Sequence, residues 1–274
     1  MFQAPLLDLL SREYDTGVSQ LDFKGAPEAS RMSINAWVSG QTKNKINDLL
    51  PGGSITDATR FVLVNALYFY GSWAHPFDAN GTTFRKFHTL AGTTVDALAM
   101  HGHFNVMYKA GNDYSVAELP YEAEQLRMTI VLPATEKFET VRGQVSGAWL
   151  DAAVRDLSPT TLEVQLPKFD VTTGSFSLMQ GLRALGMKLA FTPQADFSGI
   201  TTDTALSISD VLQKAFISVD QSGTEAAAAT AVGGLATSAA PTPTPFIVDR
   251  PFLFFIRDAT GAVLFSGQVV DLSL

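Results

Sequence analysis

The stretch FVLVNALYFYGSW, residues 61–73, sets the fold class of the chain. It is a nearly continuous apolar run, and such a run predicts a strand buried on both faces. Apolar residues at helical spacing precede it in residues 6–10 and 26–50. Alternating patterns typical of strands follow it in residues 83–134, 161–171 and 205–220. The sequence therefore predicts a mixed α+β fold.

Shorter patterns complete this prediction. A short strand is expected at VSQLDF, residues 18–23, and helices are expected at residues 138–154 and 174–186. Near the C-terminus, PFLFFIRDATGAVLFSGQVV, residues 251–270, predicts two apolar strands joined by a turn at residues 258–261. A lone hairpin is not stable, so this one must return to the sheets formed upstream.

Composition excludes several classes of function. The net charge is −8 and no basic run occurs, so we expect no nucleic-acid partner. No stretch reaches the roughly 20 apolar residues that span a bilayer, so we expect no membrane partner. The first residues lack the basic start and long apolar run of a signal peptide. There is no Cys, which excludes disulfides and thiolate chemistry and leaves the compartment open.

Catalytic and metal motifs are not visible in the sequence. Of the four histidines, only His101 and His103 have a spacing compatible with a metal, and no carboxylate lies near them in sequence. We therefore interpret them as surface or strand-edge residues and expect no metal and no cofactor. No nucleophile elbow, P-loop, dinucleotide fingerprint or zinc-protease motif occurs. We expect a protein that is not an enzyme.

One segment differs sharply in composition from the rest. Residues 226–245 read AAAATAVGGLATSAAPTPTP and carry no charge. An interdomain linker is one interpretation. However, only about thirty residues follow, and they must rejoin the upstream sheets. We therefore predict one domain, residues 1–274, with an exposed functional loop at residues 223–245.

Motifs along nearly the whole chain resemble the serpin family of serine protease inhibitors. The similar segments, in order, are SINAWVSGQTKNKINDLL (33–50), FVLVNALYFYGSWAHPFD (61–78), LPKF (166–169), ADFSGI (195–200), GTEAAAAT (223–230), RPF (250–252) and LFSG (264–267). The resemblance implies a large, mainly antiparallel sheet, a smaller sheet and helices around an exposed reactive loop. The family domain normally begins with further helices, so we expect the coding sequence to continue upstream of Met1.

The resemblance also implies a mechanism and the residues that carry it. A serpin is a suicide substrate, whose cleaved loop inserts into the main sheet and traps the acylated protease. The implied sheet-opening region contains Asn65, Trp73 and Gln213. The implied hinge comprises Gly223, Thr224, Glu225, Ala226, Ala227, Ala228, Ala229 and Thr230. Small uncharged side chains pass easily between two strands, which favours an inhibitor. Two departures affect polar contacts: Gln213 replaces the usual His and Gln221 the usual Glu.

The expected reactive bond is Thr237–Ser238, counted forward from the hinge. Counting back from Pro251 favours Ala240–Pro241, where the proline would hinder cleavage. A small residue at the cleaved bond fits an elastase-like or subtilisin-like serine protease, and Leu235 leaves a chymotrypsin-like target open. We expect a monomer, and the family favours secretion. The alternatives are a non-inhibitory serpin-like binding or storage protein and an incomplete, inactive chain.

Overall fold

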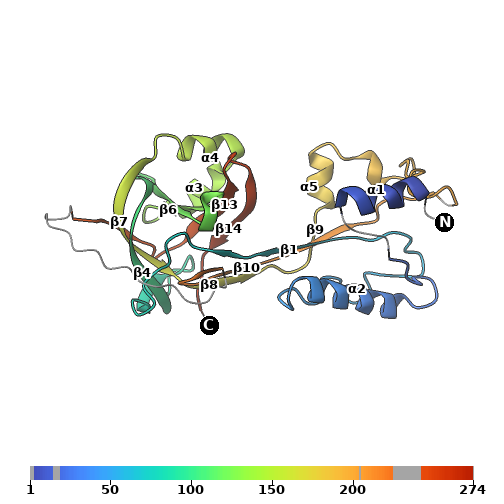
Figure 1. The fold of residues 1–274 in the computed structure, drawn as a ribbon, viewed down its shortest axis with the longest axis horizontal. Coiled ribbons are helices and arrows are strands. Elements are labelled where there is room, and N and C mark those ends of the chain that lie inside the picture. Colours follow the sequence, from blue (N-terminus) through green and yellow to red (C-terminus); the bar gives the residue numbers. More distant parts are fainter. Residues whose placement is uncertain (1–2, 15–18, 204, 225–241, 274) are drawn as a thin grey trace. The chain divides into compact units, whose positions relative to one another are not determined.

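The computed structural model describes residues 3–14, 19–203, 205–224 and 242–273, and the chain divides into two compact units (Figure 1). Unit 1 comprises Met1–Tyr68 and Val171–Ile217, and unit 2 comprises Phe69–Asp170 and Ser218–Leu274. Helices accompany a large and a smaller sheet, which confirms the predicted α+β class. The single domain expected over residues 1–274 stays a prediction. No described helix is long and apolar enough to cross a bilayer.

Unit 1 is built on the four-stranded sheet and is covered by helices on both faces (Figure 1). The strand order is β1-β10-β8, and β9 also pairs with β10. The elements are α1 (Ala4–Tyr14), α2 (Pro27–Gln41), β1 (Leu63–Phe69), β8 (Phe169–Thr172), β9 (Phe176–Ser177), α5 (Met179–Ala184), the 3-10 turn η2 (Leu189–Phe191) and β10 (Val211–Val219). Val64, Ala66 and Tyr68 of β1 pack with α2, while Leu63 packs with residues around α5. The two-residue alternation of the strand separates these two clusters.

Helix α2 ends nine residues before the predicted end at residue 50. Thr42 closes it, because its hydroxyl donates to the Val38 carbonyl and accepts from the Ile46 amide. The chain then turns through Lys43 and Asn44, which have positive φ angles. The fully buried Ile46 that follows belongs to the α2 core cluster. The apolar spacing that suggested a longer helix therefore comes from a loop packed on the same core.

Other predicted elements differ in extent. Residues 19–23 form no strand, so that prediction was wrong for the described part of VSQLDF. The predicted 138–154 helix is two helices, α3 (Phe138–Gln144) and α4 (Gly147–Ala153), because Ser146 caps the second by accepting from the Trp149 amide. The 174–186 helix is reduced to α5. In β1 only Phe69 is buried and Asn65 is exposed, so the strand is not buried on both faces.

Unit 2 is built on the eight-stranded sheet, in the order β12-β7-β4-β5-β6-β13-β14 with β3 beside β4. All pairs are antiparallel except β12 with β7. The eight strands are β3 (Thr83–His88), β4 (Thr94–Lys109), β5 (Tyr114–Pro120), β6 (Leu126–Pro133), β7 (Ser158–Pro167), β12 (Thr244–Ile247), β13 (Phe252–Asp258) and β14 (Val263–Val269), with the 3-10 turn η1 (Glu122–Glu124) between β5 and β6. A separate two-stranded sheet is formed by β2 (Gly71–Ser72) and β11 (Gly223–Thr224). Helices α3 and α4 cover β6 and β13 (Figure 1), where Val141 and Leu150 meet Val131 and Leu253.

The predicted C-terminal hairpin is present as β13 and β14. Asp258 closes its turn by accepting hydrogen bonds from the amides of Thr260 and Ala262 and from the Thr260 hydroxyl. The Thr260 hydroxyl, together with these amides, holds the pKa of Asp258 below its ordinary value. As expected, the hairpin joins an upstream strand, because β13 pairs along β6.

A buried ionic cluster ties three neighbouring strands of unit 2 together. Glu118 on β5 accepts hydrogen bonds from the Thr129 hydroxyl at 3.0 Å and from Arg257 Nη1 at 3.1 Å. Arg127 reaches the other carboxylate oxygen at 3.3 Å. The side chains of Glu118 and Arg257 are only 7% and 8% exposed, so each charge depends on the other for compensation.

Replacing Glu118 with leucine should destabilise unit 2 by about 3–5 kcal/mol, because Arg257 would stay buried without its carboxylate. The measurement is urea unfolding followed by tryptophan fluorescence in a Trp37→Phe background, which leaves only the unit 2 tryptophans. Glu139→Leu is the control, since its pair with Arg142 is exposed and should contribute less than about 1 kcal/mol. Equal losses in both variants would contradict the role assigned to the buried cluster.

Candidate functional site

The predicted hinge begins in a tight turn at the end of β10. The Asp220 amide donates to the Gly223 carbonyl at 2.9 Å, and the Gly223 amide donates back to the Asp220 carbonyl at 3.3 Å. The Asp220 carboxylate accepts from the Ser222 amide at 2.8 Å. Beyond this turn, Gly223 and Thr224 form β11, which pairs antiparallel with β2. The start of the hinge is therefore held by backbone hydrogen bonds.

An aromatic cluster supports the turn from within unit 2. The indole of Trp73 donates to the Asp220 carbonyl at 2.9 Å and stacks on Tyr121, with ring centroids 4.6 Å apart and planes 11° apart. Phe77 meets the edge of Trp73, and its amide donates to the Gln221 carbonyl at 3.0 Å. All three aromatic side chains are buried. Trp73 was predicted to belong to the sheet-opening region, and it anchors the turn directly.

Gly223 cannot carry a side chain at this position. Its φ angle is +135°, a conformation that essentially only glycine adopts. A Cβ atom would also lie 2.5 Å from the Ser72 Cα and 2.7 Å from the Trp73 nitrogen. On the facing strand, a Cβ at Gly71 would lie 3.1 Å from the Phe69 and Tyr121 rings. Two backbones thus cross in contact, and the glycine predicted for the hinge is required by both conformation and space.

One polar atom beneath the hinge is buried without a partner. The Gln221 Oε1 atom accepts no hydrogen bond from any residue that the structure describes. An unsatisfied buried acceptor destabilises a folded state by about 1–3 kcal/mol. Gln221 is one of the two departures from the family pattern noted in the sequence, and its environment gives that departure a physical consequence.

The other two predicted sheet-opening residues lie in unit 1. Asn65 is exposed on β1, and Gln213 is partly exposed on β10, opposite Phe176 of β9. The two strands are neighbours in the sheet. Tyr68 and Phe216 connect them on the α2 side, with ring centroids 6.1 Å apart. Separating β1 from β10 would break this contact.

The end residues of the predicted 223–245 loop lie in paired strands. Gly223 is buried and paired in β11, and Thr244 and Pro245 belong to β12, which pairs parallel with β7. Both ends are therefore anchored in unit 2. Glu225–Thr230 of the hinge and the Thr237–Ser238 bond lie outside the described residues. Within the described residues no three His, Asp or Glu side chains are arranged around a metal position.

Sequence reasoning missed several residues at this site. Tyr121, Phe77 and Asp220 all contact Trp73 or the turn, yet they are far from one another along the chain. Nothing in the composition of residues 119–121, LPY, indicated a stacking partner for Trp73. Such a contact depends on tertiary structure.

Comparison with known proteins places the chain among related sequences. A family model described as "Serpin (serine protease inhibitor)" matches residues 1–272. An uncharacterised serpin-like protein of Thermococcus kodakarensis is 39% identical over 270 residues, covering 97% of this chain and 62% of that protein. Human serpin B4 is 37% identical over 275 residues, covering 97% and 70% respectively. Plasminogen activator inhibitor 1 of Bos taurus is 38% identical over 269 residues, covering 95% and 66%.

Solved structures agree in fold. Serpin48 of the insect Tenebrio molitor superposes with a TM-score of 0.85 at 31% identity, covering 100% of this chain and 72% of that one. Thyroxine-binding globulin in complex with thyroxine gives a TM-score of 0.84 at 29% identity, covering 99% and 72%. The chain thus spans between 62% and 72% of the length of these relatives.

Gly223→Ala should destabilise unit 2 by about 2–4 kcal/mol, because backbone strain adds to contact with β2. Gly92→Ala is the matched control: Gly92 also has a positive φ angle, +83°, but nothing lies within 4 Å of its Cβ position. That control should cost only about 1 kcal/mol. Urea unfolding of both variants gives the difference. If the two costs were equal, close backbone contact would not be what requires glycine at the hinge.

Proposed function

The chain belongs to the serpin family of serine protease inhibitors, and from this premise we propose that it inhibits a serine protease as a suicide substrate. The observation that carries the proposal is the anchored glycine hinge. β11 ends at Thr224 and β12 begins at Thr244, and between them, after Glu225, residues 226–243 are uncharged and mostly small. A protease can be offered such a segment without unfolding either anchor.

The chemistry belongs to the protease. Its serine attacks the carbonyl carbon of Thr237, the peptide bond to Ser238 breaks, and the new amine of Ser238 takes a proton from the protease's general base. The loop is then an ester of the protease serine, which water would normally hydrolyse. In the proposed mechanism the protein supplies no catalytic group, in keeping with a function other than that of an enzyme.

Trapping requires the cleaved limb to insert into the sheet of β1 and β10 before hydrolysis. Residues 226–232 contain no charge and no proline, so they can enter as a strand at low cost. About ten new hydrogen bonds at roughly 0.5–1.5 kcal/mol each would give about 10 kcal/mol, comparable with the stability of a whole domain. Insertion must first separate Tyr68 from Phe216, which makes this contact part of the barrier.

The contacts at the hinge favour an uncleaved state in which the start of the loop is fixed by the surrounding residues. The unsatisfied Gln221 Oε1 raises the free energy of the uncleaved state, and Trp73 keeps the turn in place. Insertion can relieve the cost of the unsatisfied Gln221 Oε1, because the segment that contains Gln221 moves. Thr237 as the cleaved residue suits an elastase-like or subtilisin-like pocket, which takes small side chains. A monomer that acts outside the cell, with residues 1–274 as one domain, is part of the same proposal.

Replacing Thr224 with arginine should convert the inhibitor into a substrate. The change places a charge at the residue that must enter the sheet first and leaves the reactive bond untouched. A barrier higher by about 1.4 kcal/mol slows insertion tenfold and lets the acyl-enzyme hydrolyse. The measurement is the amount of detergent-stable complex formed per cleavage with pancreatic elastase or subtilisin, using the protein together with any residues that precede Met1.

Thr161→Arg is the matched control, because it makes the same change at an exposed position on β7. It should leave complex formation unchanged. If Thr224→Arg forms as much complex per cleavage as the parent, insertion of this limb is not the mechanism. Cleavage of the parent without any complex would favour a non-inhibitory binding protein or an incomplete, inactive chain.

A further inference from the structure

Two histidines lie side by side on the outer face of the unit 2 sheet. His101 and His103 are two residues apart on β4, so strand geometry directs both side chains to the same face. Gly102, between the two histidines, and Phe104, which follows them, face the buried side. There the ring of Phe104 packs against the ring of Phe77, with centroids 4.8 Å apart. The two imidazole rings have centroids 5.0 Å apart and planes at 90°. His103 is exposed and His101 is partly exposed.

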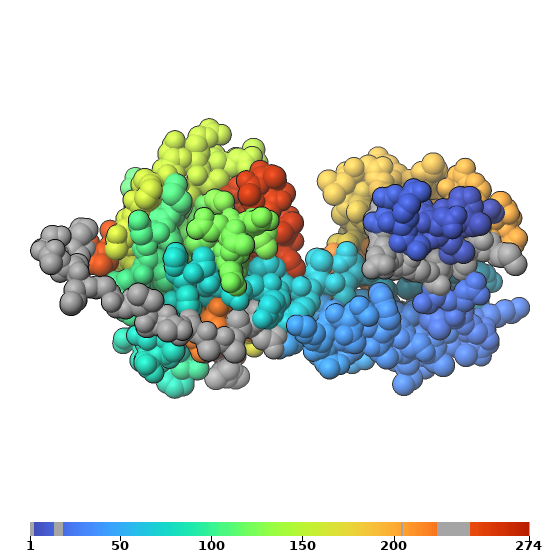
Figure 2. All heavy atoms as spheres, in the orientation of Figure 1, coloured from blue at the N-terminus to red at the C-terminus, as the bar shows by residue number. Residues whose placement is uncertain are grey.

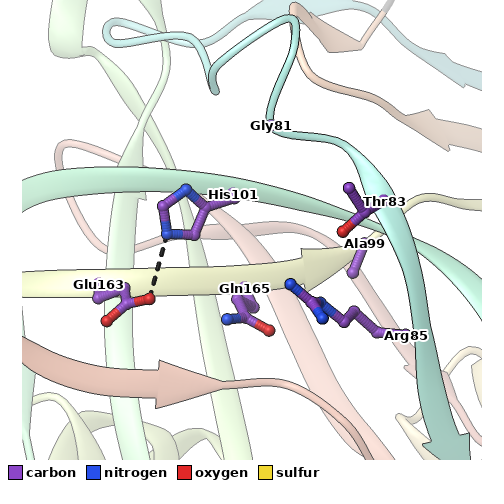
Figure 3. Close-up of a pocket in the computed structure, with 7 residues that line it drawn as sticks. All are labelled: Gly81, Thr83, Arg85, Ala99, His101, Glu163 and Gln165. Atoms are coloured by element: carbon purple, nitrogen blue, oxygen red, sulfur yellow. Dashed lines mark hydrogen bonds and ion pairs between the residues drawn. The ribbon is translucent and has the colours of Figure 1, made fainter.

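The fold brings a carboxylate to this pair that the sequence did not indicate. Glu163 of β7 stands directly opposite His103 in the antiparallel register. Its Oε1 atom lies 3.2 Å from Nε2 of His101, as the dashed line in Figure 3 shows. His101 and Glu163 line a pocket of 180 Å³ together with Gln165 and Arg85, whereas His103 lies beside this pocket on β4. Two imidazoles and one carboxylate therefore share one face of two paired strands.

We propose that His101, His103 and Glu163 bind a divalent transition-metal ion such as Zn²⁺, with water at the remaining position. Nitrogen and oxygen ligands bind Zn²⁺ at about 2.0–2.2 Å in a tetrahedron, which places neighbouring ligand atoms about 3.4 Å apart. The His101–Glu163 separation of 3.2 Å is close to that value. A metal ion would take the place of the hydrogen bond between these two atoms.

Binding requires one rearrangement. No three ligands are in position in the described part of the chain, so His103 must turn toward the other two. This side chain is exposed, so it can change rotamer on the solvent side of the sheet. Arg85, on the neighbouring strand β3, lines the same pocket and opposes a cation there. Arg85 is itself exposed, so water screens its effect.

The ion would link two long strands. β4 and β7 pair over ten residues, and β7 also holds β12, in which Pro245 lies opposite Glu163. A ligand that binds only the folded state raises its stability. The inference stands apart from the proposed inhibition, because the site is complete within β4 and β7 and needs neither the loop nor a protease.

The test is titration of the protein with Zn²⁺ alone, by calorimetry and by competition with a chelating dye. One ion per chain is expected. Loss of even an outer hydrogen-bonding partner typically weakens metal binding by about 10–100-fold, so His103→Ala and Glu163→Gln should each weaken it at least tenfold. At a fixed Zn²⁺ concentration, the ion should also raise the melting temperature of the parent more than that of either variant.

His75→Ala and His88→Ala are the matched controls, since they remove the two other histidines of the chain. They should bind Zn²⁺ as the parent does, and Arg85→Gln should bind it as tightly or more tightly. His103→Gln keeps a polar side chain, and melting without metal shows that each variant is folded. The proposal is overturned if the parent binds no Zn²⁺, or if the control variants lose as much affinity as His103→Ala and Glu163→Gln.

Discussion

The contact between two backbones at Gly223 is the constraint on which the rest of the site depends. A chain can approach a neighbouring strand this closely only without a Cβ, and the φ angle of +135° restricts the position further. Once this crossing is fixed, the Asp220 carbonyl meets the Trp73 indole and the turn docks on Phe77. The aromatic cluster thus stabilises a geometry that glycine makes possible.

Local patterns predicted most of the helices and strands, because these elements depend on the spacing of neighbouring residues. The C-terminal hairpin and the strands of the large sheet follow from alternation and turn chemistry. Helix α2 was overextended because Ile46 is buried in a loop, where packing imitates helical spacing. Trp73 and Gly223 were found through family resemblance, whereas Tyr121 and Glu163 could not be, since their partners lie far away in sequence. The reactive loop and the reactive bond expected within residues 225–241 remain predictions.

Some buried polar groups in unit 2 have hydrogen-bond partners, and others have none among the described residues. Glu118 on β5 has partners from the adjacent strand β6 and from β13 beyond it, so its cluster spans three consecutive strands. Gln221 Oε1, beneath the hinge, has none among the described residues. Thr82 Oγ1, just before β3, is a second buried acceptor with no partner among the described residues, so Gln221 is one of two such costs and the one that lies where movement is proposed. This distribution is what a protein needs when one segment must move while its scaffold stays intact.

β12 also determines whether a further strand can pair with its edge of the large sheet. It is the last strand on its side, and an open edge of this kind invites another chain to pair with it. Val248 donates its amide to Gln165, so by alternation the nitrogen of Pro245 faces away from β7. A proline there offers no N–H to an incoming strand. The four-residue edge is thus short and chemically interrupted, which protects a folded chain from adding a second copy to its sheet.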